Sequence, residues 1–204
     1  MRAACALLGG IAAAVALSGS LAQARTFEHC AGLARNSERV ACFEALRSGD
    51  GQAAGAGAWS VRQEPSEFTD DTNVYLSLES SDASVCGRNR DDRVLLWIRC
   101  REDTTSILFQ TSCHMTSSSY HDYGDVHYSL DGGPSQMIAM TKWRDNFSLG
   151  LWRGAEAIPL IWGLLDHDVM TVRMKPFDED VFTVSFDIAG LDRAIVPLRE
   201  ACHW

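Results

Sequence analysis

Apolar and polar side chains alternate along most of the chain after residue 58, which is the period of a strand with one buried face. In residues 73–79, for example, Val74, Leu76 and Leu78 share one face, and the residues between them share the other. Six further stretches repeat this alternation or hold a short apolar run: 93–100, 107–109, 126–130, 135–143, 170–174 and 182–188. The pattern predicts a mainly β (α+β) fold, with an antiparallel β-sandwich-like domain over residues 59–204.

Helical spacing occurs at both ends of this pattern and once inside it. Residues 25–47 hold two short runs of apolar side chains at helical spacing, which predict a small helical hairpin. Pro159 suits the first turn of a short apolar helix. Residues 191–202 predict a short C-terminal helix that Pro197 should kink or split. The Gly- and Ala-rich residues 48–58 predict a flexible linker between the hairpin and the β domain.

Residues 1–24 have the organisation of a cleavable signal peptide, with Arg2 before an apolar run and Ala22-Gln23-Ala24 at the cleavage point. The apolar run is shorter than the roughly 18–20 residues that span a bilayer. We therefore expect a periplasmic protein with no membrane span. The 204-residue chain has a net charge of −9, which becomes −10 when the signal is removed. This negative net charge argues against nucleic acid as a partner.

The mature chain would keep six cysteines, and an even number in an oxidising compartment predicts three disulfides. The first two pairs that we expect each close a predicted hairpin. A zinc site is the alternative, but no C-x-x-C spacing supports it. The expected pairs are Cys30–Cys42, Cys86–Cys100 and Cys113–Cys202.

A polar segment predicted between two strands contains His114, His121 and His127 together with two aspartates. Imidazole and carboxylate groups suit a divalent metal, and a hydrolytic zinc centre is one possibility. The other interpretation is a connecting loop with His127 on the solvent face of a strand. The chain has no H-E-x-x-H motif, nucleophile elbow, Walker A loop or dinucleotide fingerprint. We therefore expect no enzymatic activity and no cofactor.

Aromatic residues and arginines gather between residues 143 and 162. Trp143, Arg144, Trp152 and Arg153 belong to the residue types that dominate protein-binding hot spots. The same tryptophans could instead form the core contact between the short helix and the sheet. Both interpretations stay open, and the first makes these four residues candidates for binding a partner.

Segments spread over nearly the whole mature chain, in this order, resemble a known family. The segments are Cys30 to Cys42-Phe43, 71–80, 96–106, 113–118, 123–126, 149–152, 187–191 and 197–202. Together they are similar to the VasI/TagO family of exported accessory proteins of type VI secretion clusters. The resemblance implies a periplasmic protein associated with the secretion apparatus, and it brings no catalytic residues.

Two functions of different classes follow from these observations. The resemblance favours a non-enzymatic accessory protein that acts through protein–protein contacts with envelope components of the type VI secretion apparatus. The alternative is a periplasmic cell-wall-acting hydrolase or ligand-binding module that uses the His114–His127 loop. An immunity-like protein that binds a toxin is a third, weaker possibility. Zinc content of protein purified without an affinity tag separates the first two.

Overall fold

The computed structural model describes residues 56–69, 71–84, 86, 92–117 and 120–204, together with Gly32, Arg35 and Arg39. The predicted signal peptide, most of the predicted linker and most of the hairpin lie outside the described residues. Within the hairpin, the Arg39 N–H donates to the Arg35 carbonyl at 3.0 Å, which is one helical hydrogen bond. In the part of the chain that is described, no helix is long and apolar enough to cross a bilayer.

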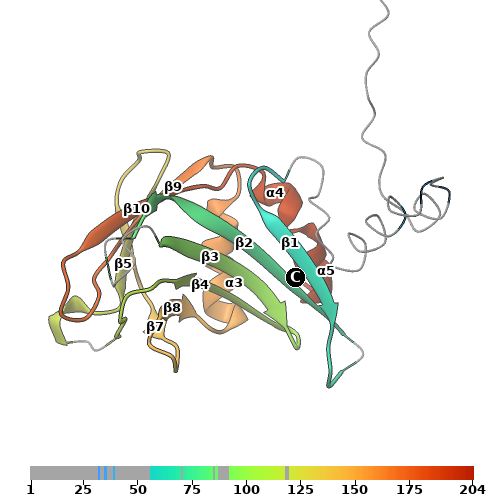
Figure 1. Cartoon of the computed structure of the whole chain (residues 1–204), viewed down its shortest axis with the longest axis horizontal. Coiled ribbons are helices and arrows are strands. Elements are labelled where there is room, and N and C mark those ends of the chain that lie inside the picture. Colours follow the sequence, from blue (N-terminus) through green and yellow to red (C-terminus); the bar gives the residue numbers. More distant parts are fainter. Residues whose placement is uncertain are drawn as a thin grey trace, which may run out of the picture.

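The described strands form two antiparallel sheets (Figure 1). The six-stranded sheet has the order β1-β2-β3-β4-β8-β7, and the four-stranded sheet has the order β10-β9-β5-β6. The strands of the first sheet are β1 (Ser60–Pro65), β2 (Thr72–Ala83), β3 (Arg93–Arg101), β4 (Thr104–Gln110), β7 (Thr141–Lys142) and β8 (Ser148–Leu151). Those of the second are β5 (Asp125–Leu130), β6 (Gln136–Ala139), β9 (Val169–Met174) and β10 (Phe182–Asp187).

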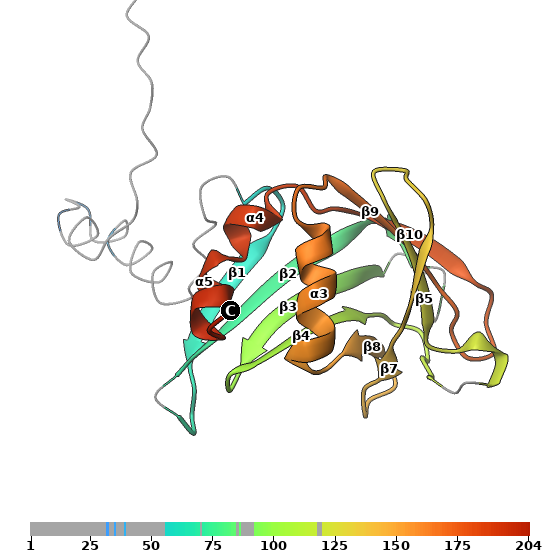
Figure 2. The ribbon, with the colours of Figure 1, turned by 180° about the vertical axis from the view of Figure 1, so that it is seen from behind.

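The helices lie on one side of the six-stranded sheet, as the view from behind shows (Figure 2). Helix α3 (Gly154–Leu164) crosses β4, and α4 (Leu191–Ala194) and α5 (Val196–Ala201) cover the end of the sheet near β1 and β2. The four-stranded sheet packs on the same side through β10 and β2. A single 3-10 turn, η1 (Tyr120–Asp122), precedes β5. The other face of the six-stranded sheet carries no described helix or strand (Figures 1 and 2).

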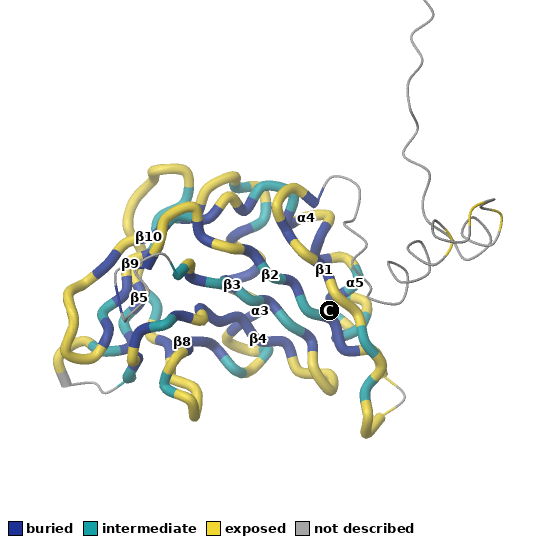
Figure 3. The backbone as a smooth tube through the Cα atoms, viewed as in Figure 1, coloured by how far each residue is buried: buried dark blue, intermediate teal, exposed yellow. Residues whose placement is uncertain are grey.

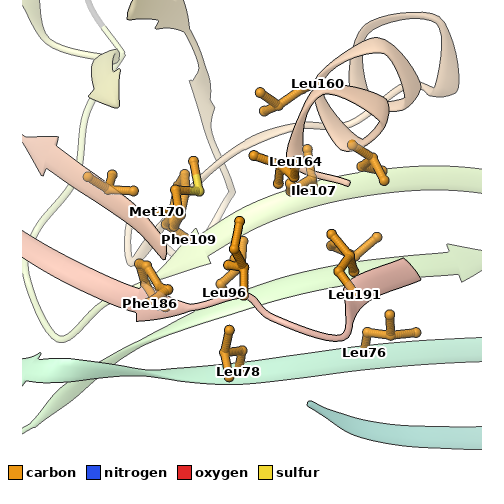
Figure 4. Packing of buried hydrophobic residues seen from close by; sticks show 14 of the residues in the cluster. Leu76, Leu78, Leu96, Ile107, Phe109, Leu160, Leu164, Met170, Phe186 and Leu191 are labelled. Carbon is orange, nitrogen blue, oxygen red and sulfur yellow. The ribbon is translucent and has the colours of Figure 1, made fainter. Parts of the chain in front are cut away.

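Alternation in the sequence becomes alternation of burial in the sheets (Figure 3). Leu76, Ile98 and Ile107 are opposite one another across β2, β3 and β4, and all three are fully buried. The layer above them comes from α3 and the four-stranded sheet, with the rings of Phe109 and Phe186 5.8 Å apart (Figure 4). Each such side chain contributes about 1.5–3 kcal/mol of hydrophobic stabilisation. The core therefore lies between the six-stranded sheet and everything packed on its inner face.

The mainly β antiparallel architecture and the short C-terminal helix are confirmed. Pro197 lies in the first turn of α5, and the terminal helix is split into α4 and α5 as expected. The prediction for the middle helix was wrong at its start, because α3 begins at Gly154 and Pro159 lies inside it. Pro159 is the sixth of the eleven residues of α3 and is exposed, and its missing N–H leaves the Ala155 carbonyl without a helical hydrogen bond from that position.

The single strand predicted over residues 135–143 is two strands that belong to different sheets. Strand β6 pairs with β5, whereas β7 pairs with β8. Met140 lies between them, is 2% exposed, and donates its N–H to the Gly124 carbonyl. The chain thus crosses from one sheet to the other at a buried residue, which alternation alone does not reveal.

The predicted cysteine pairing is wrong at both described disulfides. Ser84 N–H donates to the Asp92 carbonyl, so Cys86 lies beside the start of β3, whereas Cys100 lies near the end of that strand. Seven residues of strand separate the two ends by roughly 20 Å, and a disulfide needs Cα atoms within about 7 Å. The predicted Cys30–Cys42 pair lies outside the described residues. The observed bonds are Cys86–Cys113 and Cys100–Cys202.

Within the described residues, 56–58 of the predicted linker already pack against the β domain. Ala56 is 1% exposed within the core, and the buried indole of Trp59 donates to the Ile188 carbonyl at 3.2 Å. Gly57 has a φ of 60°, and a Cβ there would lie 2.2 Å from the Ala189 carbonyl oxygen. Only glycine fits this close approach. Residues 56–58 therefore pack with the segment that follows β10.

Candidate functional site

Two tryptophans flank the β7–β8 hairpin, and the hairpin brings them together on the outer side of the six-stranded sheet. The Trp143 N–H donates to the Ser148 carbonyl at 2.9 Å, which closes the turn. The indole N–H of Trp152 donates to the Thr141 carbonyl at 3.0 Å, and the two ring centroids are 4.6 Å apart. Trp143 remains 42% exposed. The two indole rings thus pack against each other, and the hairpin backbone fixes the Trp152 indole N–H and the Trp143 main chain.

Arg99 of β3 lies beside this tryptophan pair. Its Nε donates to the Ser106 hydroxyl at 2.9 Å, across the β3–β4 ladder. The guanidinium carbon is 5.5 Å from the Trp152 ring and 5.8 Å from the Trp143 ring, which is cation–π distance. Burial, followed by repulsion from Arg101, lowers the pKa of Arg99, but a guanidinium remains charged at physiological pH.

The outer face around Arg99 forms a hollow of about 250 Å³. Trp97 lines it, with its indole N–H donated to the Gln110 side-chain oxygen at 2.9 Å. Tyr75 lines the opposite wall, and the Arg62 guanidinium lies 5.0 Å from its ring. Burial, and then the hydrogen bond and charge of Glu64, raise the pKa of Tyr75. Each large side chain of the wall is thus held by a neighbour before any ligand arrives.

Gly150 of β8 sets the depth of this hollow. It pairs with Leu108, and a Cβ at Gly150 would lie 2.7 Å from the Leu108 Cβ. Leu108 is 6% exposed and lines the hollow. A glycine at this position lets β8 approach β4 closely enough for Leu108 to lie beneath the aromatic side chains.

A second hollow, of about 460 Å³, opens on the other side of the tryptophan pair. Trp143 and Trp152 line both hollows, and the exposed side chains of Arg144 and Arg153 line the second one. The structure therefore brings the four predicted partner-binding residues together. Their role in binding stays a prediction, and we call these four residues together with Arg99 the Trp–Arg cluster.

Cations outnumber acidic groups around the Trp–Arg cluster, although the whole chain has a net charge of −9. Asp145 accepts a hydrogen bond from the Phe147 N–H, so this carboxylate is used within its own turn. No described Asp or Glu forms an ion pair with Arg99. The charged residues lining the two hollows are the cationic Arg62, Arg99, Lys142, Arg144 and Arg153 and the acidic Asp145 and Glu156.

Two of the three histidines proposed as metal ligands border one aromatic pair, Tyr123 and Phe177, whose ring centroids are 5.9 Å apart, and the third lies on a strand. The His114 ring packs on Phe177 with centroids 5.4 Å apart, and the His121 ring lies 6.1 Å from the Tyr123 ring. His127 is on the outer face of β5, opposite Arg173 of β9. Across the described residues, no group of three His, Cys, Asp or Glu side chains is placed to hold a metal ion. The histidines therefore do not converge on one site here.

Sequence reasoning missed Arg99, Trp97 and Tyr75. The apolar run at 94–98 indicated a central strand and drew attention to its buried side. These three residues occupy the strand positions that face away from the core. A sequence signal was present there, because these positions carry aromatic and arginine side chains in place of short polar ones. Trp162, grouped with the tryptophans by sequence distance, instead packs on Arg199 at 4.4 Å.

Comparison with known proteins places the chain in a family. A family model described as type VI secretion system VasI, EvfG matches residues 29–204. The matched range contains both sheets, all described helices, both described disulfides and the Trp–Arg cluster. No curated protein and no solved structure matches the chain significantly. Since the match covers most of the 204 residues, the chain belongs to the VasI/EvfG family of type VI secretion system proteins.

Proposed function

We propose that this protein is an exported, non-enzymatic accessory protein of the type VI secretion apparatus that acts through protein–protein contacts in the periplasm. The observation that carries this proposal is the Trp–Arg cluster. It places a 42% exposed Trp143 and its partner Trp152 on a sheet face that no described helix or strand covers.

The chemistry of the cluster supports protein binding. Trp and Arg are among the side chains most enriched in interface hot spots. Trp buries a large area at a low cost in conformational entropy, and the Arg guanidinium makes charge-assisted hydrogen bonds. Trp152 is fixed by its hydrogen bond to Thr141, and Arg99 is fixed by Ser106. A surface that is already ordered loses little entropy when a partner binds.

The covalent structure supports an exported location. Disulfides persist in oxidising compartments and are rare where thiols are kept reduced. The bond between Cys86 and Cys113, and the bond between Cys100 and Cys202, join segments that are 27 and 102 residues apart. Cross-links of this span are structural, and they fit a protein that works outside the cytoplasm.

Photo-cross-linking in the native cell tests the proposal. A p-benzoylphenylalanine at Glu156, an exposed residue that lines the second hollow, should give covalent adducts with envelope components of the type VI apparatus. The matched control places the same probe at Glu179, an exposed residue of the turn between β9 and β10. Adducts from Glu156 and not from Glu179 support the proposal. No protein adduct from Glu156, or equal adducts from both positions, contradicts it.

A further inference from the structure

The hollow at Arg99 has the chemistry of a site for one carboxylate. The guanidinium uses its Nε for Ser106 and makes no ion pair with any described Asp or Glu. A guanidinium has five N–H groups in a planar fork, and the fork matches the two oxygens of a carboxylate. Arg99 is also partly removed from water between aromatic rings, where a charge without a counter-ion is costly.

The walls of the hollow limit the size of what it accepts. Its volume of about 250 Å³ is below the roughly 300–1,000 Å³ of clefts that enclose a whole small-molecule ligand. One acidic side chain fits within this volume, where Leu108 and the indole of Trp97 offer apolar surface for its methylene groups beside Arg99. A ligand that inserts a single side chain has the rest of its structure outside, which is the situation of a protein partner.

The surroundings have the charge that such a partner requires. Lys142, Arg144 and Arg153 line the neighbouring hollow, and only Glu156 opposes them there. The acidic Asp145 at the rim of the first hollow is held by the Phe147 N–H. An otherwise acidic protein thus presents a local cationic surface, which attracts an acidic segment of a partner.

We propose that the hollow beside Trp143 and Trp152 binds an acidic side chain of a partner protein, with Arg99 as the bidentate anchor of the carboxylate. The neighbouring Lys142, Arg144 and Arg153 receive further acidic residues of the same segment. This inference rests on the proposed function, since it names the chemistry by which the partner is recognised.

A peptide titration followed by NMR tests the inference without any type VI component. The probes are the blocked peptides acetyl-Gly-Glu-Gly-amide and acetyl-Gly-Gln-Gly-amide, which differ only in the carboxylate, and they are added to the oxidised, 15N-labelled protein. The Glu peptide should shift the indole N–H signals of Trp97 and Trp152 saturably, with a Kd near 1 mM (about −4 kcal/mol). The Gln peptide should bind about tenfold more weakly, because it lacks the charge-assisted pair.

Two variants and a control assign the effect to Arg99. Arg99→Gln should weaken the Glu peptide about tenfold, and Arg99→Lys should lie between the two because it keeps the charge and loses the fork. Arg173→Gln, on the outer face of the four-stranded sheet, should leave binding unchanged. The same spectra report whether each variant is folded.

The remaining outcomes decide between this inference and the proposed function. Equal binding of both peptides, no saturable shift, or full binding by Arg99→Gln overturns the inference. Saturable binding of glucuronate with an inert Glu peptide also overturns it, in favour of an acidic glycan. Adducts at Glu156 with no effect of Arg99→Gln on the titration overturn the inference alone. Arg99-dependent peptide binding with no protein adduct in the cell overturns the proposed function alone.

Discussion

The outer faces of the two sheets are built on the same antiparallel backbone and carry different chemistry. On the four-stranded sheet, His127, Ser129, Thr171, Arg173 and Thr183 line a hollow of about 460 Å³. Most of these side chains are short and polar, and water solvates them well. On the six-stranded sheet, the equivalent outward positions carry Trp97 and Arg99, with the Trp143–Trp152 pair beside them. The two outer faces therefore differ in their tryptophan content, and this difference is the reason that we propose the six-stranded face as the binding surface.

The two sheets also differ in the interactions that tie their segments together. Both described disulfides connect segments of the six-stranded sheet or its flanks. The four-stranded sheet depends at one end on Asp131, which follows β5. The Asp131 carboxylate accepts the N–H groups of Asp168 and Val169 at 3.1 and 2.8 Å and lies 2.7 Å from the His167 ring nitrogen. One sheet has covalent cross-links, and the other has a hydrogen-bonded carboxylate that can be protonated.

Removing a disulfide from the six-stranded sheet should cause the largest change in the stability of the protein. The double variant Cys100→Ala/Cys202→Ala opens a loop of 102 residues. The unfolded chain then gains conformational entropy, which predicts a decrease of about 4.7 kcal/mol in the free energy of unfolding. Cys86→Ala/Cys113→Ala opens a loop of 27 residues, with a predicted decrease of about 3.5 kcal/mol. Urea unfolding of the two variants measures both. A larger loss for the shorter loop would show that local strain, not loop length, governs these bonds.

The binding difference between the two faces is the next largest effect. Trp143→Ala/Trp152→Ala should reduce adducts from the Glu156 probe at least tenfold, because hot-spot residues each contribute about 2 kcal/mol or more. Thr171→Ala/Thr183→Ala removes two side chains from the other outer face and should leave the adducts unchanged. Quantitative immunoblots of the cross-linked product measure both. Equal losses from the two double variants would remove the distinction between the faces.

The smallest predicted effect concerns pH. The hydrogen bond to His167, and then that from the Val169 N–H, lower the pKa of Asp131 below its ordinary value of 3.8. A lowered folded-state pKa means that the stabilisation is present above pH 3.8 and is lost as the pH falls through the lowered pKa. Asp131→Asn should therefore be less stable than the wild type at neutral pH, and the difference should vanish in acid.

Urea midpoints across the pH range measure this difference. The control is Asp178→Asn, at an exposed turn residue whose φ of 57° is close to the 50° of Asp131. If both variants show the same pH dependence, the effect belongs to aspartate turns in general and not to the His167 contact.

Local pattern predicted the longer strands such as β2, because burial on one face imposes the alternation seen at Val74, Leu76 and Leu78, but it predicted no separate strand at β1 or β8. Features that depend on contacts between segments far apart in the sequence could not be predicted from the local pattern. The disulfide partner of Cys100 is set by the position of α5 over β3, and no local spacing encodes that position. Trp143 and Trp152 were recognised as candidates, but their union with Arg99 requires β8 to pair with β4. The sequence therefore identified the types of residue at the candidate site, but it did not show which of them lie side by side in the fold.

The connectivity of the disulfides has a consequence for how the protein is made. Cys100 lies between Cys86 and Cys113 in the chain, so the two bonds interleave. When cysteines emerge in order into an oxidising compartment, Cys100 reaches Cys86 before Cys113 does, and the native partner of Cys100 follows 102 residues later. A bond between those first two cysteines must then be exchanged through a mixed disulfide. Where that bond forms, maturation of the protein requires disulfide isomerisation in addition to oxidation.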